Sequence, residues 1–275
     1  AAAGSAVSSL LLKSRALLAL RGEQALPLLQ GIVTNDVRQL QARPSIAAFI
    51  LDTNGKIVDD VIVRREEGDE VLVECAVERR ESIKALLIKY RLRKKVDIES
   101  VDDRVVTWAP QQFDGAIEDP RLGGVALGWR AYGKPVEGAA SGDEQYSRRR
   151  WLVGVGEGAA ELSGVMPWHA NGDLIKAVSS EKGCYVGQEL TARTATQGVL
   201  RRRIVPFRTT AKVEGEEVVA DEGKKVGRVL AGDSTCGIAL LSLVALGRPL
   251  KVGNVPIDAF LPEHMKQKKL ERVAI

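Results

Sequence analysis

Two apolar runs joined by an Asn-Gly turn constrain the fold of this chain most. Residues 46–51 (IAAFIL) and 56–64 (KIVDDVIVR) flank Asp52, Thr53, Asn54 and Gly55. An Asn-Gly pair between such runs is the strongest short-range signal for a β-hairpin. The residues that follow predict a strand over 71–76, a helix over 78–92 and a strand over 95–98. Together these elements predict an α+β unit with helices on one face.

The segments before and after this unit extend the pattern. Residues 10–20 predict a strand pair or a strand that enters a turn, and residues 23–31 predict a helix that ends at Gly31. The loop after that helix would then display Thr34, Asn35 and Asp36. Two further stretches continue the pattern into a second α+β unit, namely 105–109 and 119–129.

Predicted loops become frequent before Arg203, and short β-rich runs follow it. Loops are expected over 133–142 and 156–164, with a helix over 145–155 between them. Short β-rich runs broken by glycines then follow, which is typical of a small antiparallel barrel. We therefore expect an α+β region over residues 1–203, made of two interleaved subdomains, and a separate C-terminal β-barrel domain over 204–275.

Composition excludes several classes of protein. The 275 residues carry a net charge of +4 and only 4% aromatic residues, so the sequence does not favour a nucleic-acid-binding protein. No apolar run approaches the roughly 20 residues needed to cross a bilayer, and we expect no membrane insertion. Three widely spaced cysteines and two histidines argue for a reducing compartment and against a self-contained zinc or iron–sulfur cage.

Residues 182–189 (KGCYVGQE) combine chemically demanding residue types in a short space. Gly183 and Gly187 favour a tight turn that holds Cys184 in place. The charge of Lys182 would favour the thiolate of Cys184, which is the form that attacks electrophiles and binds soft metals. The alternative is a cysteine that is a small buried hydrophobic residue, since free cysteines are often buried.

Two polar patterns add candidate site residues. Asp59 and Asp60 interrupt an apolar strand, so one carboxylate must point into an interior or a pocket unless the strand lies at an edge and both reach water. Residues 188–194, which include Gln188, Glu189 and Arg193, alternate polar and apolar side chains. This alternation predicts a half-buried strand whose polar side faces solvent or a cavity, with a plain edge strand as the alternative.

The longer segment KGCYVGQELTART, followed by GVLRRR over 198–203, resembles the signature of the T-protein-like (YgfZ/GcvT) family. Within that family it is most similar to the branch of mitochondrial iron–sulfur cluster assembly factors. Other segments resemble the family in the same order, namely LRGEQALPLLQGIVTNDV over 20–37, YRLRKKVDIE over 90–99 and DPRLGGVALGWR over 119–130. The resemblance spans about residues 10–262.

This resemblance implies a ring of three subdomains that in relatives accepts tetrahydrofolate, with an antiparallel barrel at the C-terminus. It implies an assembly factor, more readily than an enzyme, that works with an A-type carrier protein to mature apo [4Fe–4S] client enzymes. Cys184, next to Lys182, would be the metal ligand of a transient [2Fe–2S] cluster shared with the carrier. The residues implied for cofactor binding are Asn35, Asp59, Asp60, Gln188, Glu189 and Arg193.

Other functions stay open on the sequence alone. A tetrahydrofolate-dependent aminomethyltransferase would use Asp59 or Asp60, and a protein-binding scaffold would keep Cys184 as a structural residue. Where relatives of the assembly type carry a folate-reading glutamate, this chain has His169, which cannot offer a bidentate pair of acceptors. A start without methionine favours a processed protein of the mitochondrial matrix over one of the bacterial cytoplasm.

Overall fold

The computed structural model describes residues 9–136, 138–220, 223–266 and 268–273. The chain divides into two compact units, each built from several segments. The first unit contains the chain up to Gly31 together with Val37–Ala47 and Val61–Tyr146, and the second contains Ile32–Asp36, Ala48–Asp60 and the chain from Ser147 onward. The predicted hairpin therefore contributes to both units, because its strands pass from one to the other.

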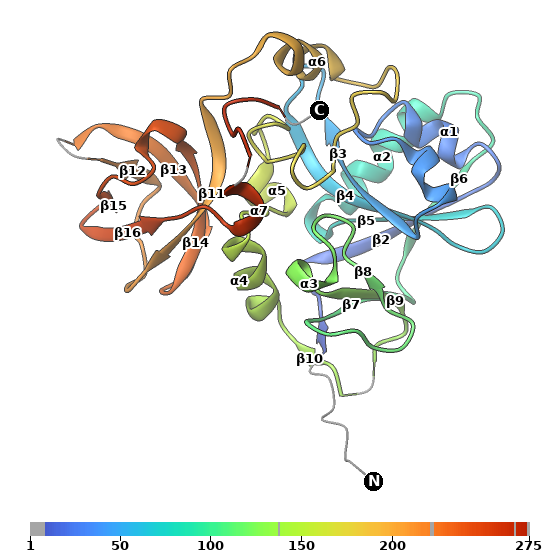
Figure 1. The fold of residues 1–275 in the computed structure, drawn as a ribbon. Helices are drawn as coiled ribbons and strands as arrows, with labels where there is room; N and C mark the ends of the chain where they lie inside the picture. The colour runs from blue at the N-terminus through green and yellow to red at the C-terminus, as the bar shows by residue number, and fades with distance from the viewer. Residues whose placement is uncertain (1–8, 137, 221–222, 267, 274–275) are drawn as a thin grey trace. The chain divides into compact units, whose positions relative to one another are not determined.

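A five-stranded sheet in the order β3-β4-β5-β2-β6 contains this hairpin (Figure 1). Its strands are β2 (Arg15–Arg21), β3 (Ser45–Leu51), β4 (Ile57–Arg65), β5 (Glu70–Ala76) and β6 (Asp97–Val101). The hairpin turn is held by Asp52, whose carboxylate accepts hydrogen bonds from the backbone N–H groups of Asn54 (2.9 Å) and Lys56 (2.8 Å). The expected hairpin is thus confirmed, and the sheet runs on from it.

Two helices belong to this layer. They are α1 (Ala25–Gln30) and, after the 3-10 turn η2 (Val77–Arg79), α2 (Arg80–Arg91). Helix α2 packs against β2 and β6 and buries Ile83 and Leu87, which lie four residues apart on one helical face. The rest of α2 carries charged side chains such as Glu81 and Lys89 together with the exposed Ile88.

A second five-stranded sheet in the first unit has the order β10-β1-β7-β9-β8. Its strands are β1 (Leu10–Leu11), β7 (Val105–Ala109), β8 (Ile117–Glu118), β9 (Trp129–Gly133) and β10 (Ala140–Ser141), with α3 (Gly124–Leu127) between β8 and β9. Trp108 and Tyr146 are buried in its core with ring centroids 5.4 Å apart. The short β10 lies within the segment predicted to be a loop, so that expectation was wrong at 140–141.

Buried charges in the first unit are paired with one another. Arg130 donates to Glu74 (2.7 Å) and to Asp119 (2.9 Å), and Arg121 donates to Asp119 (2.7 Å). Burial alone would raise the pKa of Asp119, but the guanidinium groups of Arg121 and Arg130 hold it at about 2. Paired carboxylates of this kind stabilise the folded state only while they stay ionised.

The C-terminal part of the second unit is a closed antiparallel barrel in the order β11-β14-β13-β12-β15-β16. Its strands are β11 (Arg202–Thr209), β12 (Glu217–Val219), β13 (Lys225–Gly232), β14 (Cys236–Ser242), β15 (Leu250–Val252) and β16 (Val255–Ala259). Val205, Phe207, Val218 and Leu241 lie in its core. Closure removes free sheet edges, and the α+β fold with a C-terminal antiparallel barrel is as predicted from the sequence.

The other helices are short. They are the 3-10 turns η1 (Val37–Gln41) and η4 (Leu243–Ala245) and the α-helices α4 (Glu144–Leu152), α5 (Gly158–Leu162), α6 (Gln188–Gln197) and α7 (Glu263–Lys266). Helix α5 occupies a segment predicted to be a loop, so that expectation was wrong. Within the described residues, no helix combines the length and apolar character that a membrane span requires.

Candidate functional site

Cys184 lies on an exposed turn of the second unit. It is exposed, whereas Cys75 and Cys236 are buried. The flanking glycines both adopt positive φ, +88° at Gly183 and +78° at Gly187, which side chains of L-residues rarely accept. The predicted glycine turn is confirmed, and the alternative of a buried structural cysteine is wrong for this position.

Lys182 fixes one side of this turn. Its side chain is buried, and its ammonium group donates a hydrogen bond to the backbone carbonyl of Val33. The same group lies 4.6 Å from the ring centroid of Tyr185, within the range of a cation–π interaction. Burial raises the pKa of Tyr185 to about 12, so this ring stays neutral at physiological pH. Two side chains next to Cys184 are thus held together.

Gly187 fixes the other side. A Cβ atom built on Gly187 would overlap the carbonyl oxygen of Asp52 and lie 2.9 Å from Cβ of Leu51. A Cβ on Gly55, which has φ +74°, would lie 2.9 Å from the carbonyl oxygen of Gly187. The tip of the β3–β4 hairpin therefore packs directly on the backbone of the cysteine turn. Glycine is required at both positions for this approach.

Residues 188–194 form most of α6, so the predicted half-buried strand was wrong. Gly187 in the left-handed region precedes the first turn of α6, and the side-chain oxygen of Gln188 accepts a hydrogen bond from the backbone N–H of Tyr185 (3.1 Å). Glu189 and Arg193 form an exposed ion pair across one helical turn (2.8 Å). Residues four positions apart lie on the same face in a strand and also in a helix. The spacing of Glu189 and Arg193 therefore fits either element.

Trp168 anchors α6 to the rest of the second unit. It is buried, and its indole N–H donates to the carbonyl oxygen of Thr191 (2.8 Å). The sequence patterns indicated no role for Trp168 or Tyr185. The signal was present for Tyr185, since an aromatic residue next to Lys182 along a tight turn is a natural cation–π partner.

Thr34 and Asn35 are buried, so the expectation that their loop displays them was wrong for both. The hydroxyl of Thr34 donates to the carbonyl of Ala177 (2.7 Å) and accepts from the backbone N–H of Phe49 (2.8 Å). The amide of Asn35 donates to the carbonyl of Lys176 (2.7 Å). These bonds tie the loop before the cysteine turn to β3. The cofactor-binding role predicted for Asn35 stays a prediction.

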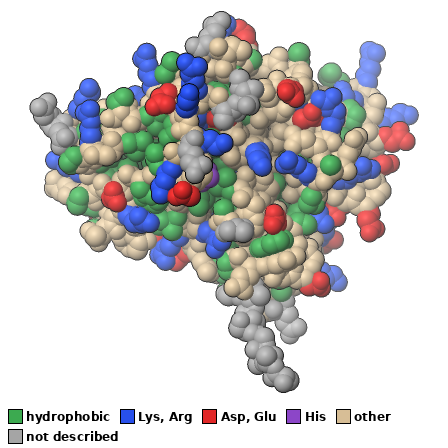
Figure 2. All heavy atoms as spheres, in the orientation of Figure 1, with side chains coloured by type: hydrophobic (Ala, Val, Ile, Leu, Met, Phe, Trp, Pro, Cys, Tyr) green, Lys and Arg blue, Asp and Glu red, His purple; other side chains and the backbone are tan. Residues whose placement is uncertain are grey.

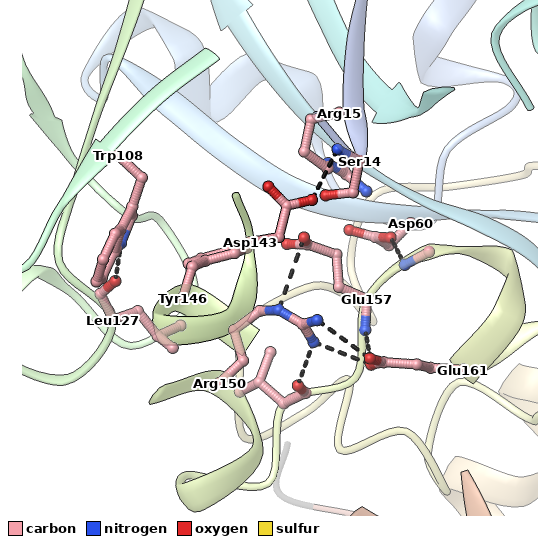
Figure 3. A network of polar contacts seen from close by, with 12 residues as sticks. Ser14, Arg15, Asp60, Trp108, Leu127, Asp143, Tyr146, Arg150, Glu157 and Glu161 are labelled. Atoms are coloured by element: carbon pink, nitrogen blue, oxygen red, sulfur yellow. Dashed lines mark hydrogen bonds and ion pairs between the residues drawn. The ribbon is translucent and has the colours of Figure 1, made fainter. Parts of the chain in front are cut away.

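Asp59 and Asp60 are both buried on β4, which lies between β3 and β5 in the sheet. The alternative of an edge strand with two solvated carboxylates is therefore wrong. Side chains of neighbouring strand residues point to opposite faces, and Asp60 accepts a hydrogen bond from the backbone N–H of Gly158 at the start of α5 (2.6 Å). Figure 3 shows Asp60 with this bond.

Helix α5 is itself held by a buried ion pair that Figure 3 also shows. Arg150 donates to both carboxylate oxygens of Glu161 (2.9 and 3.1 Å) and to the carbonyl of Val155 (3.0 Å). Glu161 also accepts from the backbone N–H of Glu157 (2.7 Å). A two-pronged pair of this kind fixes geometry well, so the donor that Asp60 uses is rigidly placed.

His169 is half-buried in the position where the family resemblance placed a glutamate. Burial, and then the charges of Lys56, Arg202 and Arg203, lower the pKa of His169 to about 4. The imidazole is therefore neutral at physiological pH, with one donor and one acceptor nitrogen. It cannot replace a carboxylate that would accept two hydrogen bonds from a pterin.

The described residues contain no group of three or more His, Cys, Asp or Glu side chains that could hold a metal ion. Lys and Arg side chains are spread among acidic and neutral ones over the face shown in Figure 2. A metal ion or cluster bound at Cys184 would need further ligands supplied by another molecule.

Known proteins that are similar to this chain agree with the fold described above. Residues 201–267 match the CAF17 C-terminal β-barrel domain family. The chain resembles the crystal structure of the glycine cleavage system aminomethyltransferase T from Bartonella henselae with a TM-score of 0.74 and 14% identity, over 98% of this chain and 88% of that one. This likeness confirms the expected T-protein type of fold.

Proteins related to this chain in sequence indicate its family more narrowly than the solved structure does. The mitochondrial iron–sulfur cluster assembly factor IBA57 of Homo sapiens is 34% identical over 95% of this chain and 86% of its own length. The Mus musculus protein of the same name is 30% identical over 92% and 84%. The Pyricularia oryzae homologue is 30% identical over 84% and 71%. All three relatives are named as mitochondrial proteins, in agreement with the expected mitochondrial location. The chain belongs to the family of the iron–sulfur cluster assembly factor IBA57.

Proposed function

We propose that this chain acts in mitochondrial iron–sulfur cluster assembly and that Cys184 supplies one thiolate to a [2Fe–2S] cluster held jointly with an A-type carrier protein. The family supports the first part. The single observation that carries the second is the exposure of Cys184 on a turn with anchored flanks. Thiolates are the natural ligands of such clusters. The cluster is cargo for the maturation of apo [4Fe–4S] client enzymes, in which two [2Fe–2S] units and two electrons from an external reductant make one [4Fe–4S] cluster.

Residues on both sides of Cys184 hold its turn in one conformation before a partner binds. The hydrogen bond from Lys182 to Val33 and the close packing of Gly187 on Asp52 fix the turn before a partner arrives. A preorganised ligand loses less conformational entropy on binding than a mobile one. When the thiol of Cys184 binds iron, its proton passes to water, and the remaining ligand positions are left to the carrier.

The helix after the turn suits a docking surface beside the sulfur. Glu189 and Arg193 are exposed on α6 and carry opposite charges one turn apart. Such a charge pair can orient a partner and set its on-rate more than its affinity. The side-chain oxygen of Gln188, by contrast, accepts a hydrogen bond from the turn itself. We therefore assign Gln188 a role in positioning Cys184.

The test is complex formation between the full chain and an A-type carrier loaded with a [2Fe–2S] cluster. We expect the wild-type chain to form a coloured heterodimer on size exclusion, and the Cys184→Ala variant to lose it. Cys236→Ala is the matched control, because Cys236 is buried in the barrel. A Cys184→Ala variant that kept the complex and its visible absorption would contradict the proposal. Transfer to an apo-aconitase-like client gives a second readout.

The rival function is a tetrahydrofolate-dependent aminomethyltransferase, and the buried carboxylates on β4 favour it. Asp60 already accepts from the Gly158 N–H group, however, and neutral His169 does not fit the pterin-reading role of a carboxylate. Both observations count against a folate-dependent reaction at this site. Titration with tetrahydrofolate separates the two functions. Tight binding that is lost in Asp60→Asn and kept in Cys184→Ala would favour the transferase.

A further inference from the structure

One end of the C-terminal barrel carries a cavity that the cluster role does not use. In the antiparallel order of the barrel, β11 and β13 begin at this end, while β12 and β14 finish there. Arg202, at the start of β11, lies opposite Ser242, at the end of β14. The 3-10 turn η4 follows directly. The cavity between these strand ends measures about 550 Å³, which is within the size range of small-molecule sites.

The lining of this cavity is strongly basic. Four cationic residues contribute to it, namely Arg202, Lys224, Lys225 and Arg248, and none of the described residues that line it is acidic. All four are exposed. Lys225 also pairs with Glu217, which lies outside the cavity. Like charges gathered around one concavity repel one another and raise the local concentration of anions.

The floor of the cavity is small and apolar. Val226 and Ala245 are buried there, and the side chain of Ser242 is half-buried at its wall. No aromatic side chain is among the described lining residues, so a nucleobase would have nothing to stack on. Arginine offers a planar fork of donors that matches carboxylate and phosphate oxygens. The floor leaves room for a short carbon skeleton beneath such groups.

The geometry points to a binding site for a small multivalent oxyanion, a phosphate compound or a di- or tricarboxylate, in this barrel cavity. Arg202 and Arg248 donate hydrogen bonds to its oxygens. Lys224 and Lys225 add positive charge at the rim, and Ser242 provides a hydroxyl donor. The site is separate from the cysteine turn in sequence and does not depend on the cluster role.

Calorimetric titration of the full chain tests this site, with pyrophosphate and citrate as the two probes. We expect saturable binding of at least one probe that weakens as salt is raised. Arg202→Gln and Arg248→Gln should each weaken it by about tenfold or more, as expected for loss of a charge-assisted bidentate contact. Tighter binding of pyrophosphate identifies the ligand class as phosphates, and tighter binding of citrate identifies it as polycarboxylates.

Arg201→Gln is the matched control. Arg201 neighbours Arg202 and is also exposed, but it does not line the cavity. It should therefore change the affinity less than about threefold, since it removes the same charge without a contact. Thermal melts of all three variants confirm that the barrel is folded. The inference is overturned if neither probe shows saturable binding, or if Arg201→Gln weakens binding as much as the two cavity variants do.

Discussion

The two glycines beside Cys184 form a natural pair for measuring how tightly the cysteine turn is packed. Both have similar positive φ, but their surroundings differ. A Cβ on Gly183 would meet no atom within 4 Å, whereas one on Gly187 would overlap the backbone of Asp52. Alanine at either position is forced into the left-handed region, which costs about 1–2 kcal/mol. At Gly187 the overlap adds about 1–3 kcal/mol, because the hairpin backbone must shift.

We therefore expect Gly183→Ala to lower the free energy of unfolding by about 1–2 kcal/mol and Gly187→Ala to lower it by about 2–5 kcal/mol. Urea denaturation followed by far-UV circular dichroism measures both. Thermal melts should show the same order, with about 2–4 °C per kcal/mol for a chain of this size. Equal losses in the two variants would refute the close packing of the turn on the hairpin, and with it the argument that Cys184 is held rigidly.

Three further predictions concern charges. Lys182→Met should destabilise the fold by about 1–3 kcal/mol, because the buried carbonyl of Val33 loses its donor, and should weaken the coloured complex with the carrier although Cys184 is intact. His169, with a folded pKa of about 4 against an ordinary 6.5, resists protonation in the folded state. Stability should thus be full above pH 6.5 and fall as the pH drops toward 4, and His169→Gln should flatten this dependence in melts across that range. Asp119, held at about 2 against 3.8, contributes stability that is present above its unfolded pKa and lost between pH 4 and 2. Asp119→Asn should remove this acid transition in pH-dependent melts and destabilise the chain at pH 7, since it leaves buried guanidinium groups with less negative charge.

Local signals predicted much of the fold. The turn at Asp52 to Gly55 closes within four residues, so the sequence alone contains all that the hairpin needs. The barrel was predicted for a similar reason, since short strands at short intervals with glycines between them leave few other arrangements. The contacts of the hairpin lie close together along the chain, whereas closure of the barrel also pairs Phe207 of β11 with Ala259 of β16.

The wrong predictions concern residues whose burial depends on partners that are distant in the sequence. Thr34 and Asn35 look like loop residues, but they are buried because they bond to Ala177 and Lys176, more than 140 positions further along the chain. Whether Asp59 and Asp60 reach water depends on strand order, which places β4 inside the sheet. No pattern within the strand contains that information.

Helix α6 shows how a short pattern can fit two periods. Polar residues at 188, 189, 191, 193 and 194 satisfy strand alternation only in part, and Glu189 and Arg193 equally satisfy the spacing of one helical turn. The deciding contact is the hydrogen bond from Trp168 to Thr191, which ties the helix to a buried residue 23 positions earlier. A helix at this place changes the chemistry expected there, because it turns Gln188 back toward Tyr185 and leaves Glu189 on the outside.

The exposure of Cys184 has the same long-range origin. A turn with two glycines has high intrinsic freedom, and by itself it would present its sulfur in many positions. Two contacts remove that freedom, one from Lys182 to Val33, 149 residues earlier in the chain, and one between Gly187 and the hairpin tip. The chain therefore holds the exposed Cys184 from both sides of the turn, through the buried Lys182 and the closely packed Gly187. This arrangement suits a ligand that must meet a metal centre held by another protein, because the cost of ordering the turn is met during folding and not at each encounter.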